Sequence, residues 1–190
     1  YRACVKPNND FFIELDYNAA EARVVLSLSD NEQPHEDIHQ YHATRLYNCS
    51  RAEAKVRFFA WLYNPNSNDI VSSGKYNRDL ILSRYRHNDS VETLFDRKIK
   101  CDDFNAFNYL IQSTCADMVL DRMVSIHKLL KNRKSYVAFT LHDSIILDFA
   151  SEDKDLIKTI IEEYKNTKLG KFKTTVSAGK DLYNLSKILI

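Results

Sequence analysis

The chain has 190 residues, of which 44% are hydrophobic and 28% are charged, with only three glycines and three prolines. This composition excludes a disordered or collagen-like chain, and because the longest apolar runs have only the length of a strand, we expect a soluble protein without a membrane partner. The four cysteines are widely spaced, which is typical of reduced thiols in an intracellular protein.

The net charge of +1 conceals an uneven distribution. Residues 1–44 hold three basic side chains against eight acidic ones, whereas residues 45–100 hold eleven against six. A protein that handles a polyanion together with divalent metal would have this pattern, since carboxylates bind cations and Lys and Arg bind phosphates. Ordinary solvated charge would give the same count.

The first half of the chain predicts a strand and several helices. An apolar run over residues 11–15 ends at Asp16 and indicates a buried strand. We expect Asn18 to cap a helix that ends at Leu28, a loop over 29–35, and helical structure over 37–47. Ser50 and Glu53 predict a capping box for a helix that ends at Tyr63, before Asn64-Pro65. We expect the polar stretch 68–100 to form one or two helices.

The second half predicts a long amphipathic helix and a hairpin. The helix covers residues 103–130, and two β-like runs, 136–141 and 144–149, flank His142-Asp143 at the tip of the hairpin. A helix over 152–166 and a last strand over 172–176 follow. Because the elements do not alternate as regular βαβ units, we expect an α+β fold with an antiparallel sheet backed by helices.

Two acidic residues lie at the ends of apolar strands. Asp16 and Asp143 would pay a desolvation cost there unless each has a partner. If the two strands are neighbours, the carboxylates repel each other, and divalent cations between them would relieve that repulsion, as in a two-metal phosphoryl-transfer site. Asp at a hairpin tip is also a common turn residue without any catalytic role.

The helix over 51–63 carries a regular series of side chains. Arg51, Lys55, Phe59 and Tyr63 recur every fourth residue, so they share one face over about 18 Å of helix axis. The cations come first and the aromatic rings last, which matches a nucleoside triphosphate, whose phosphates attract Arg and Lys and whose base stacks on aromatic rings. The alternative is that the aromatic residues are core and the cations are solvated.

Six motifs in order resemble family A DNA polymerases, the group of bacterial DNA polymerase I and its phage relatives. Arg51-x-x-x-Lys55-x-x-x-Phe59-x-x-x-Tyr63 is similar to the fingers helix, and the segments at 15–23 and 141–144 are similar to the first and last palm motifs. The other matches are Asp37-Ile38-His39 with Ala43, Asn108-x-x-x-Gln112-x-Thr114-x-Ala116-Asp117, and 179–183. The resemblance implies a palm over 1–48 and 103–190 with a short helical fingers subdomain over 49–102.

The resemblance also implies roles for individual residues. It implies two Mg²⁺ ions on Asp16, Asp143 and the Tyr17 backbone carbonyl, and a triphosphate held by Arg51, Lys55 and His39, with Lys55 as general acid toward pyrophosphate. Phe59 and Tyr63 would form the nucleotide and template pocket, and Glu21 would exclude a ribose 2′-hydroxyl. The residues implied to contact primer–template DNA are Asn108, Gln112, His142 and Arg23.

This chain departs from the family in several places. Ser144 stands where the DNA polymerases usually carry Glu, and His-Asp-Ser is the form of single-subunit phage RNA polymerases, although Glu21 and Phe59 favour the DNA enzymes. Ala60 and Asn64 replace glycines. We expect the thumb and exonuclease to be absent, so that synthesis from dNTPs depends on an upstream segment or subunit.

Three other readings remain open. The chain could be similar to an RNA polymerase or be a catalytically silent nucleic-acid-binding module, and His35-Glu36-x-x-His39 matches the zinc metalloprotease signature H-E-x-x-H. The high content of Asn, Lys, Ile and Tyr indicates a phage or an organelle as the source. The expected location is therefore the cytoplasm, that of the host for a phage, or an organelle.

Overall fold

A computed structural model describes residues 1–189, which form two compact units. Unit 1 consists of Tyr1–Asn18 and residues 118–189, and unit 2 consists of Ala19–Asp117. The long helix α6 (Ala106–Leu129) begins in unit 2 and ends in unit 1. The palm and fingers boundaries expected from the sequence remain a prediction, and each unit is described separately.

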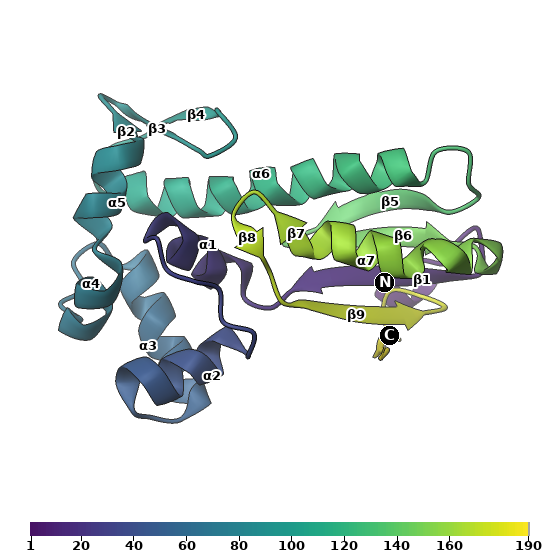
Figure 1. Cartoon of the computed structure of the whole chain (residues 1–190), viewed down its shortest axis with the longest axis horizontal. Helices are drawn as coiled ribbons and strands as arrows, with labels where there is room; N and C mark the ends of the chain where they lie inside the picture. Colours follow the sequence, from purple (N-terminus) through teal and green to yellow (C-terminus); the bar gives the residue numbers. More distant parts are fainter. Residues whose placement is uncertain (190) are drawn as a thin grey trace. The chain divides into compact units, whose positions relative to one another are not determined.

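Unit 1 is built on a five-stranded antiparallel sheet with the order β10-β9-β1-β6-β5 (Figure 1). Its strands are β1 (Phe11–Tyr17), β5 (Tyr136–Leu141), β6 (Ser144–Phe149), β9 (Thr174–Gly179) and β10 (Ser186–Lys187). The remaining elements are η1 (Arg2–Cys4), η3 (Ser151–Leu156), α7 (Ile157–Lys165), β7 (Asn166–Thr167) and β8 (Gly170–Lys171). The antiparallel sheet and the helices confirm the predicted α+β fold.

The alternation of side chains along β1 separates the two faces of the sheet. Ile13, Leu15 and Tyr17 point to one face and are buried, and the Tyr17 ring stacks on Tyr164 of α7 with a centroid distance of 4.1 Å. Glu14 and Asp16 occupy the other face and are only partly buried. β1 therefore anchors the core with one face and presents carboxylates on the other.

Unit 2 is mainly helical. It contains α1 (Ala20–Leu28), α2 (Ile38–His42), the π-helical turn η2 (Ala43–Tyr47), α3 (Arg51–Tyr63), α4 (Ile70–Tyr76) and α5 (Arg78–Tyr85). A small antiparallel sheet follows, formed by β2 (Arg86–His87), β3 (Ser90–Glu92) and β4 (Lys98–Lys100). Buried aromatic rings of Phe58, Trp61, Tyr76 and Phe107 form its core.

The helix after β1 begins differently from the expectation. Asn18 was predicted as its cap, but Ala19 is the N-cap residue, in the left-handed region with φ of 52°. The Asn18 amide instead donates to the Lys173 carbonyl at 2.9 Å, which extends the strand pairing by one residue beyond Tyr17. The backbone therefore turns one position later than the sequence indicated.

Three other expectations need correction. Residues 68–100 contain a three-stranded sheet besides two helices, since strands of two or three residues are too short to show alternation. The helix expected over 152–166 starts as the 3₁₀ turn η3 before α7. The strand expected over 172–176 is β9, from Thr174 to Gly179, because the Phe172 amide bonds to the Lys165 carbonyl, and β10 follows it.

The other predicted elements are confirmed, including the loop over 29–35, the helix over 51–63, the long helix and the hairpin. The four cysteines are free thiols. None of the helices formed by residues 1–189 combines the length and apolar character that crossing a membrane requires.

Candidate active site

Strand pairing in unit 1 brings the two predicted acidic residues together. β1 and β6 are neighbouring antiparallel strands (Figure 1). Asp16 is directly opposite Ser144, and Asp143 immediately precedes Ser144. Asp143 lies at the tip of the β5–β6 hairpin, where His142 has a positive φ of 55°. The two carboxylates are close enough to interact electrostatically. Residues 127 positions apart in sequence thus form one acidic pair.

The environment of Asp16 disfavours its charged form. Burial raises the pKa of Asp16 to about 7, and the neighbouring carboxylates of Asp143 and Glu14 add to the increase, whereas Lys187 opposes it. A carboxylate in this state is stabilised by a cation that neutralises the repulsion. Within residues 1–189, no group of three or more His, Cys, Asp and Glu side chains is arranged to hold a metal ion. The candidate metal site therefore rests on two carboxylates, the number that Mg²⁺ often uses together with substrate phosphates.

The face of the sheet that carries Asp16 contains two further charged residues that the sequence did not indicate. Glu14 precedes Asp16 by two positions and so points to the same face. Lys187 pairs with Ser177, which in turn pairs with Glu14, so this lysine lies on that face as well. The period of two along β1 could have identified Glu14, but β10 has only two residues and leaves no pattern to find Lys187.

The helix α3 begins with a complete capping box in unit 2. The Ser50 hydroxyl accepts from the Glu53 amide at 3.3 Å, and the Glu53 carboxylate accepts from the Ser50 amide at 2.9 Å. These two bonds satisfy backbone donors that the first turn of a helix leaves unpaired. They fix the start of α3 at Arg51, with Ser50 as the N-cap residue.

The four residues of the predicted series lie on the outer side of α3. Arg51, Lys55 and Tyr63 are exposed and Phe59 is partly buried. The opposite side of the helix provides the core, with the buried residues Ala54, Phe58, Trp61 and Leu62. The alternative that Phe59 and Tyr63 are core residues is therefore wrong. The Arg51–Tyr63 series is available to a ligand.

Arg51 and His39 have partners near the start of α3. The Arg51 guanidinium donates to both oxygens of Asp37, at 3.0 and 2.8 Å, and Asp37 also caps α2 by accepting from the Gln40 amide. The His39 ring lies 5.5 Å from Phe59, and burial lowers the pKa of His39 to about 4. The imidazole is therefore neutral at pH 7, and Arg51 and Lys55 provide the positive charge of this region.

At the other end of α3, Tyr63 connects three helices of unit 2. Its hydroxyl donates to the Glu21 carboxylate of α1. Burial raises the pKa of Tyr63, Glu21 adds to the increase, and the side chain of Gln112 in α6 opposes it. The ring of Tyr63 stacks on Phe59 with a centroid distance of 5.7 Å and an interplanar angle of 10°. Tyr63, Glu21 and Gln112, which the resemblance linked to nucleotide and primer binding, are thus neighbours.

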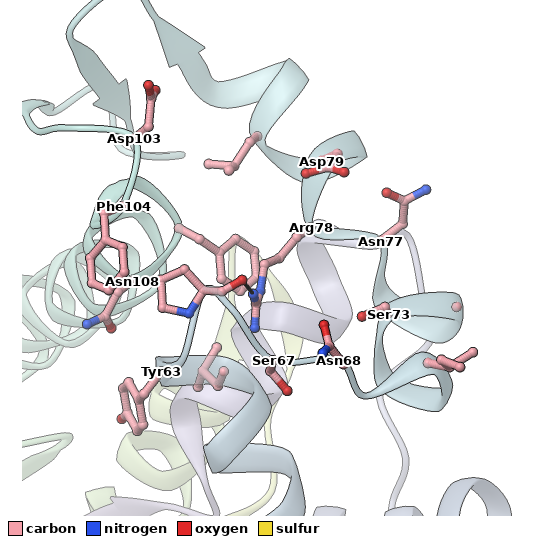
Figure 2. Close-up of a pocket in the computed structure, with 16 residues that line it drawn as sticks. Tyr63, Ser67, Asn68, Ser73, Asn77, Arg78, Asp79, Asp103, Phe104 and Asn108 are labelled. Carbon is pink, nitrogen blue, oxygen red and sulfur yellow. Dashed lines mark hydrogen bonds between the residues drawn. The ribbon is translucent and has the colours of Figure 1, made fainter.

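A cavity of about 790 Å³ lies beside Tyr63 in unit 2 (Figure 2). Tyr63 and Asn108 line one side of it, and Asn77 and Asp79 line the other. The Asn108 side-chain oxygen is buried without a hydrogen-bond partner among the described residues, so it can accept a hydrogen bond from a ligand. The cavity therefore lies next to the aromatic end of α3 and offers both polar and apolar side chains to a ligand.

The side chain of Arg23 has a structural role. Its side chain is completely buried and donates to the Gln33 side chain and to the carbonyls of Pro34 and Glu36. A guanidinium that is enclosed in this way holds the 33–36 loop, so we assign Arg23 this role in place of the predicted contact with primer–template. His142, by contrast, is exposed at the hairpin tip.

The H-E-x-x-H match does not form a zinc site. His35 and Glu36 lie in a bend before α2, and only His39 is helical. The zinc signature needs both histidines one turn apart on the same helix. The metalloprotease alternative is therefore wrong.

Comparisons with known proteins agree with the motif analysis. No family model matches the chain. It is 26% identical to DNA polymerase I of Caldicellulosiruptor bescii over 79% of its length, and 25% identical to DNA polymerase I of Lactococcus lactis subsp. lactis over 85%. The chain spans about a quarter of the length of these relatives (24% of each).

A solved structure shares the fold. The POL domain of Pol1 from M. smegmatis, in complex with DNA primer-template and dNTP, matches with a TM-score of 0.79 and 14% sequence identity. The match covers 95% of this chain and 42% of that one.

Proposed function

We propose that this chain, a relative of the family A DNA polymerases, joins a deoxynucleotide to the 3′-hydroxyl of a primer under the direction of a template. The observation that carries the proposal is the pairing of β1 with β6, which brings Asp16 and Asp143 close to each other. In the reaction the primer 3′-oxygen forms a bond to the α-phosphorus, and the bond from that phosphorus to pyrophosphate breaks.

The proposed metal ligands are Asp16, Asp143 and the Tyr17 backbone carbonyl. All three offer hard oxygen donors, which suit Mg²⁺, and the carboxylates are close enough for their repulsion to raise the pKa of Asp16. Two bound Mg²⁺ ions would stabilise the charge on the attacking and leaving oxygens. The residues present therefore fit this cofactor.

The exposed face of α3 is proposed to bind the nucleotide. Arg51 and Lys55 would hold the triphosphate, with His39 beside them as a neutral hydrogen-bonding group, and Lys55 would donate a proton to pyrophosphate as it leaves. Phe59 and Tyr63 present two parallel rings for the base. Glu21, held by Tyr63, would occupy the space that a ribose 2′-hydroxyl needs.

The template and primer are proposed to contact residues at the start of α6 and the hairpin tip. Asn108 and Gln112 would bind the DNA near the primer terminus, together with His142. The cavity beside Tyr63 is proposed to receive an unpaired template base, because its wall offers an aromatic ring and a free amide oxygen. DNA is favoured over RNA as the product because Glu21 is present where a ribonucleotide enzyme needs space.

A dependence on an upstream thumb or exonuclease segment, a phage source and a cytoplasmic location stay predictions.

Incorporation of a single labelled nucleotide tests the proposal. The chain, in excess over a primed template, is supplied with Mg²⁺ and either dNTP or rNTP. We expect incorporation of the templated dNTP and at least about a thousandfold slower incorporation by Asp143→Asn, since a metal contributes several kcal/mol to such a step. Asp155→Asn, an exposed carboxylate change in the same unit, is the matched control. An Asp143→Asn chain as active as the unaltered one would exclude the two-metal assignment.

A further inference from the structure

Glu14 lies on the same face of the sheet as Asp16, one of the proposed metal ligands. It precedes Asp16 by two residues on β1, so their side chains leave the strand on the same side. Asp16 is opposite Ser144 in β6, and Glu14 is opposite Ile146. The Glu14 carboxylate is close enough to Asp16 to disfavour its negative charge.

Ser144 connects this carboxylate to the hairpin that carries Asp143. Its side chain is buried, with 2% of the residue exposed, and its hydroxyl lies 3.3 Å from Glu14 Oε1 and 2.8 Å from the Leu141 carbonyl oxygen. Both neighbours are acceptors, so the hydroxyl proton can be directed to either of them. Ser144 is also the position at which the related DNA polymerases usually carry a glutamate.

We infer that Glu14 supplies, from the neighbouring strand, the carboxylate that this chain lacks at position 144. The inference rests on the proposed function and extends it to a positioning residue of the same site. Glu14 would act through Ser144 and through its charge, as groups behind metal ligands commonly do. Asp16 and Asp143 remain the ligands.

The alternative is that Glu14 only stabilises the fold. Among residues 1–189, the hydroxyl of Ser144 is the hydrogen-bond donor to its carboxylate, and no Lys or Arg side chain forms an ion pair with it. A second carboxylate next to Asp16 adds repulsion at that site, and a bound cation would relieve it. A position kept for stability alone would favour a neutral side chain.

A carboxylate at position 14 also has a physical advantage over one at position 144. A glutamate at the nearly inaccessible position of Ser144 would be more strongly desolvated than one at Glu14, which is partly exposed. Placing the charge at Glu14 on β1 keeps it on the same face of the sheet, two residue pairs away along the ladder. The site retains its negative charge with a smaller burial cost.

Metal binding by the full chain without nucleotide tests this inference. Free Mn²⁺ is measured by electron paramagnetic resonance during titration of the unaltered chain, Glu14→Gln, Glu14→Asp and the control Glu152→Gln, an exposed carboxylate of the same unit. We expect Mn²⁺ affinity to fall about tenfold in Glu14→Gln, to recover largely in Glu14→Asp, and to be unchanged in the control. Equal affinity of Glu14→Gln and the unaltered chain overturns the inference.

Moving the carboxylate from position 14 to position 144 makes the test more specific. The double variant Glu14→Gln with Ser144→Glu returns the carboxylate to its usual place in the family and should bind Mn²⁺ more tightly than Glu14→Gln alone. If the folded double variant, checked by circular dichroism, binds no better, the inference fails. If burial at position 144 prevents folding, the Glu14→Asp result decides.

Asp143→Asn is titrated with Mn²⁺ in parallel. Unaltered Mn²⁺ binding by Asp143→Asn would refute the proposed metal site itself, whereas a loss of binding confined to Asp143→Asn would refute only the role of Glu14.

Discussion

Tyr63 donates a hydrogen bond from its hydroxyl to Glu21, while its ring stacks on Phe59 one turn earlier in α3. Within unit 2, this arrangement joins the aromatic end of α3 to the side chain proposed to exclude ribonucleotides. The orientation of Glu21 therefore depends on a residue that lies 42 positions later in the sequence.

Removing the Glu21 side chain should weaken the selection of deoxynucleotides. In Glu21→Ala we expect the ratio of kcat/KM for dNTP to kcat/KM for rNTP to fall about tenfold or more, because a steric contact of this kind contributes about 1–3 kcal/mol to discrimination. Tyr63→Phe keeps the stacked ring and removes only the hydroxyl, so its ratio should lie between that of Glu21→Ala and that of the unaltered chain. A Glu21→Ala chain that discriminates as strongly as the unaltered one would contradict the proposed role of Glu21.

Asp37 should compete with the nucleotide for Arg51. The two side chains form a bidentate pair, with 50% of the Arg51 side chain exposed. In Asp37→Asn we expect the KM for dNTP to fall about two- to fivefold, since an exposed ion pair contributes up to about 1 kcal/mol. The asparagine oxygen can still accept from the Gln40 amide and so preserve the cap of α2. Asp30→Asn, which breaks the exposed pair with Arg84, should leave KM unchanged; an unchanged KM in Asp37→Asn as well would show that Arg51 is not limited by this pair.

The capping box of α3 should contribute measurably to stability. Ser50→Ala removes the acceptor for the Glu53 amide, and we expect the free energy of unfolding in urea to fall by about 1 kcal/mol. Glu53→Gln is the control, because glutamine can also accept from the Ser50 amide and complete the box. If both variants lose the same free energy, the hydroxyl of Ser50 is not the stabilising group.

His42 should make the fold sensitive to acid. Burial lowers the pKa of His42 to about 3, with His39 and Lys75 adding to the decrease and Asp37 opposing it, and its Nε2 lies 2.5 Å from the Tyr76 hydroxyl. The unfolded chain binds the proton near pH 6.5 and the folded chain near pH 3, so the contribution of this histidine to stability is lost as the pH falls through that range.

The raised pKa of Asp16 has the opposite effect on stability, since it makes the folded chain more stable as the pH falls from about 7 to 4. The pH dependence of the unfolding free energy is therefore compared between variants. We expect the loss of unfolding free energy between pH 6.5 and 4 to be smaller in His42→Gln than in the unaltered chain. The exposed His127 is the matched position, and His127→Gln should keep the original dependence. The same slope in all three chains would exclude His42 as the source.

Periodicity and caps predicted much of this structure. The apolar run that ends at Asp16, the Ser50 and Glu53 pair and the i, i+4 series on α3 are local patterns, and local patterns specify strands, caps and helix faces. Such patterns could also indicate that Asp16 and Asp143 lie at the ends of strands. They could not show that β1 pairs with β6, since this pairing depends on contacts between distant residues.

The same limit explains what the sequence did not reveal. Arg23 matches a motif of the family, yet its burial depends on carbonyls of the 33–36 loop that no spacing rule identifies. The hydrogen bond from Ser144 to Glu14 depends on the register of two strands. The small sheet formed by β2, β3 and β4 has strands of at most three residues, too short for any periodic signal.

A double-variant cycle at Asp16 and Asp143 tests the central claim most directly. Single-nucleotide incorporation with Mg²⁺ is measured for Asp16→Asn, Asp143→Asn and the chain with both changes. If the two carboxylates hold the same metal ions, each single change should abolish most of the rate, and the double variant should be little slower than either single variant. Losses that multiply in the double variant, or a single variant that keeps its rate, would show that the two residues do not form one site.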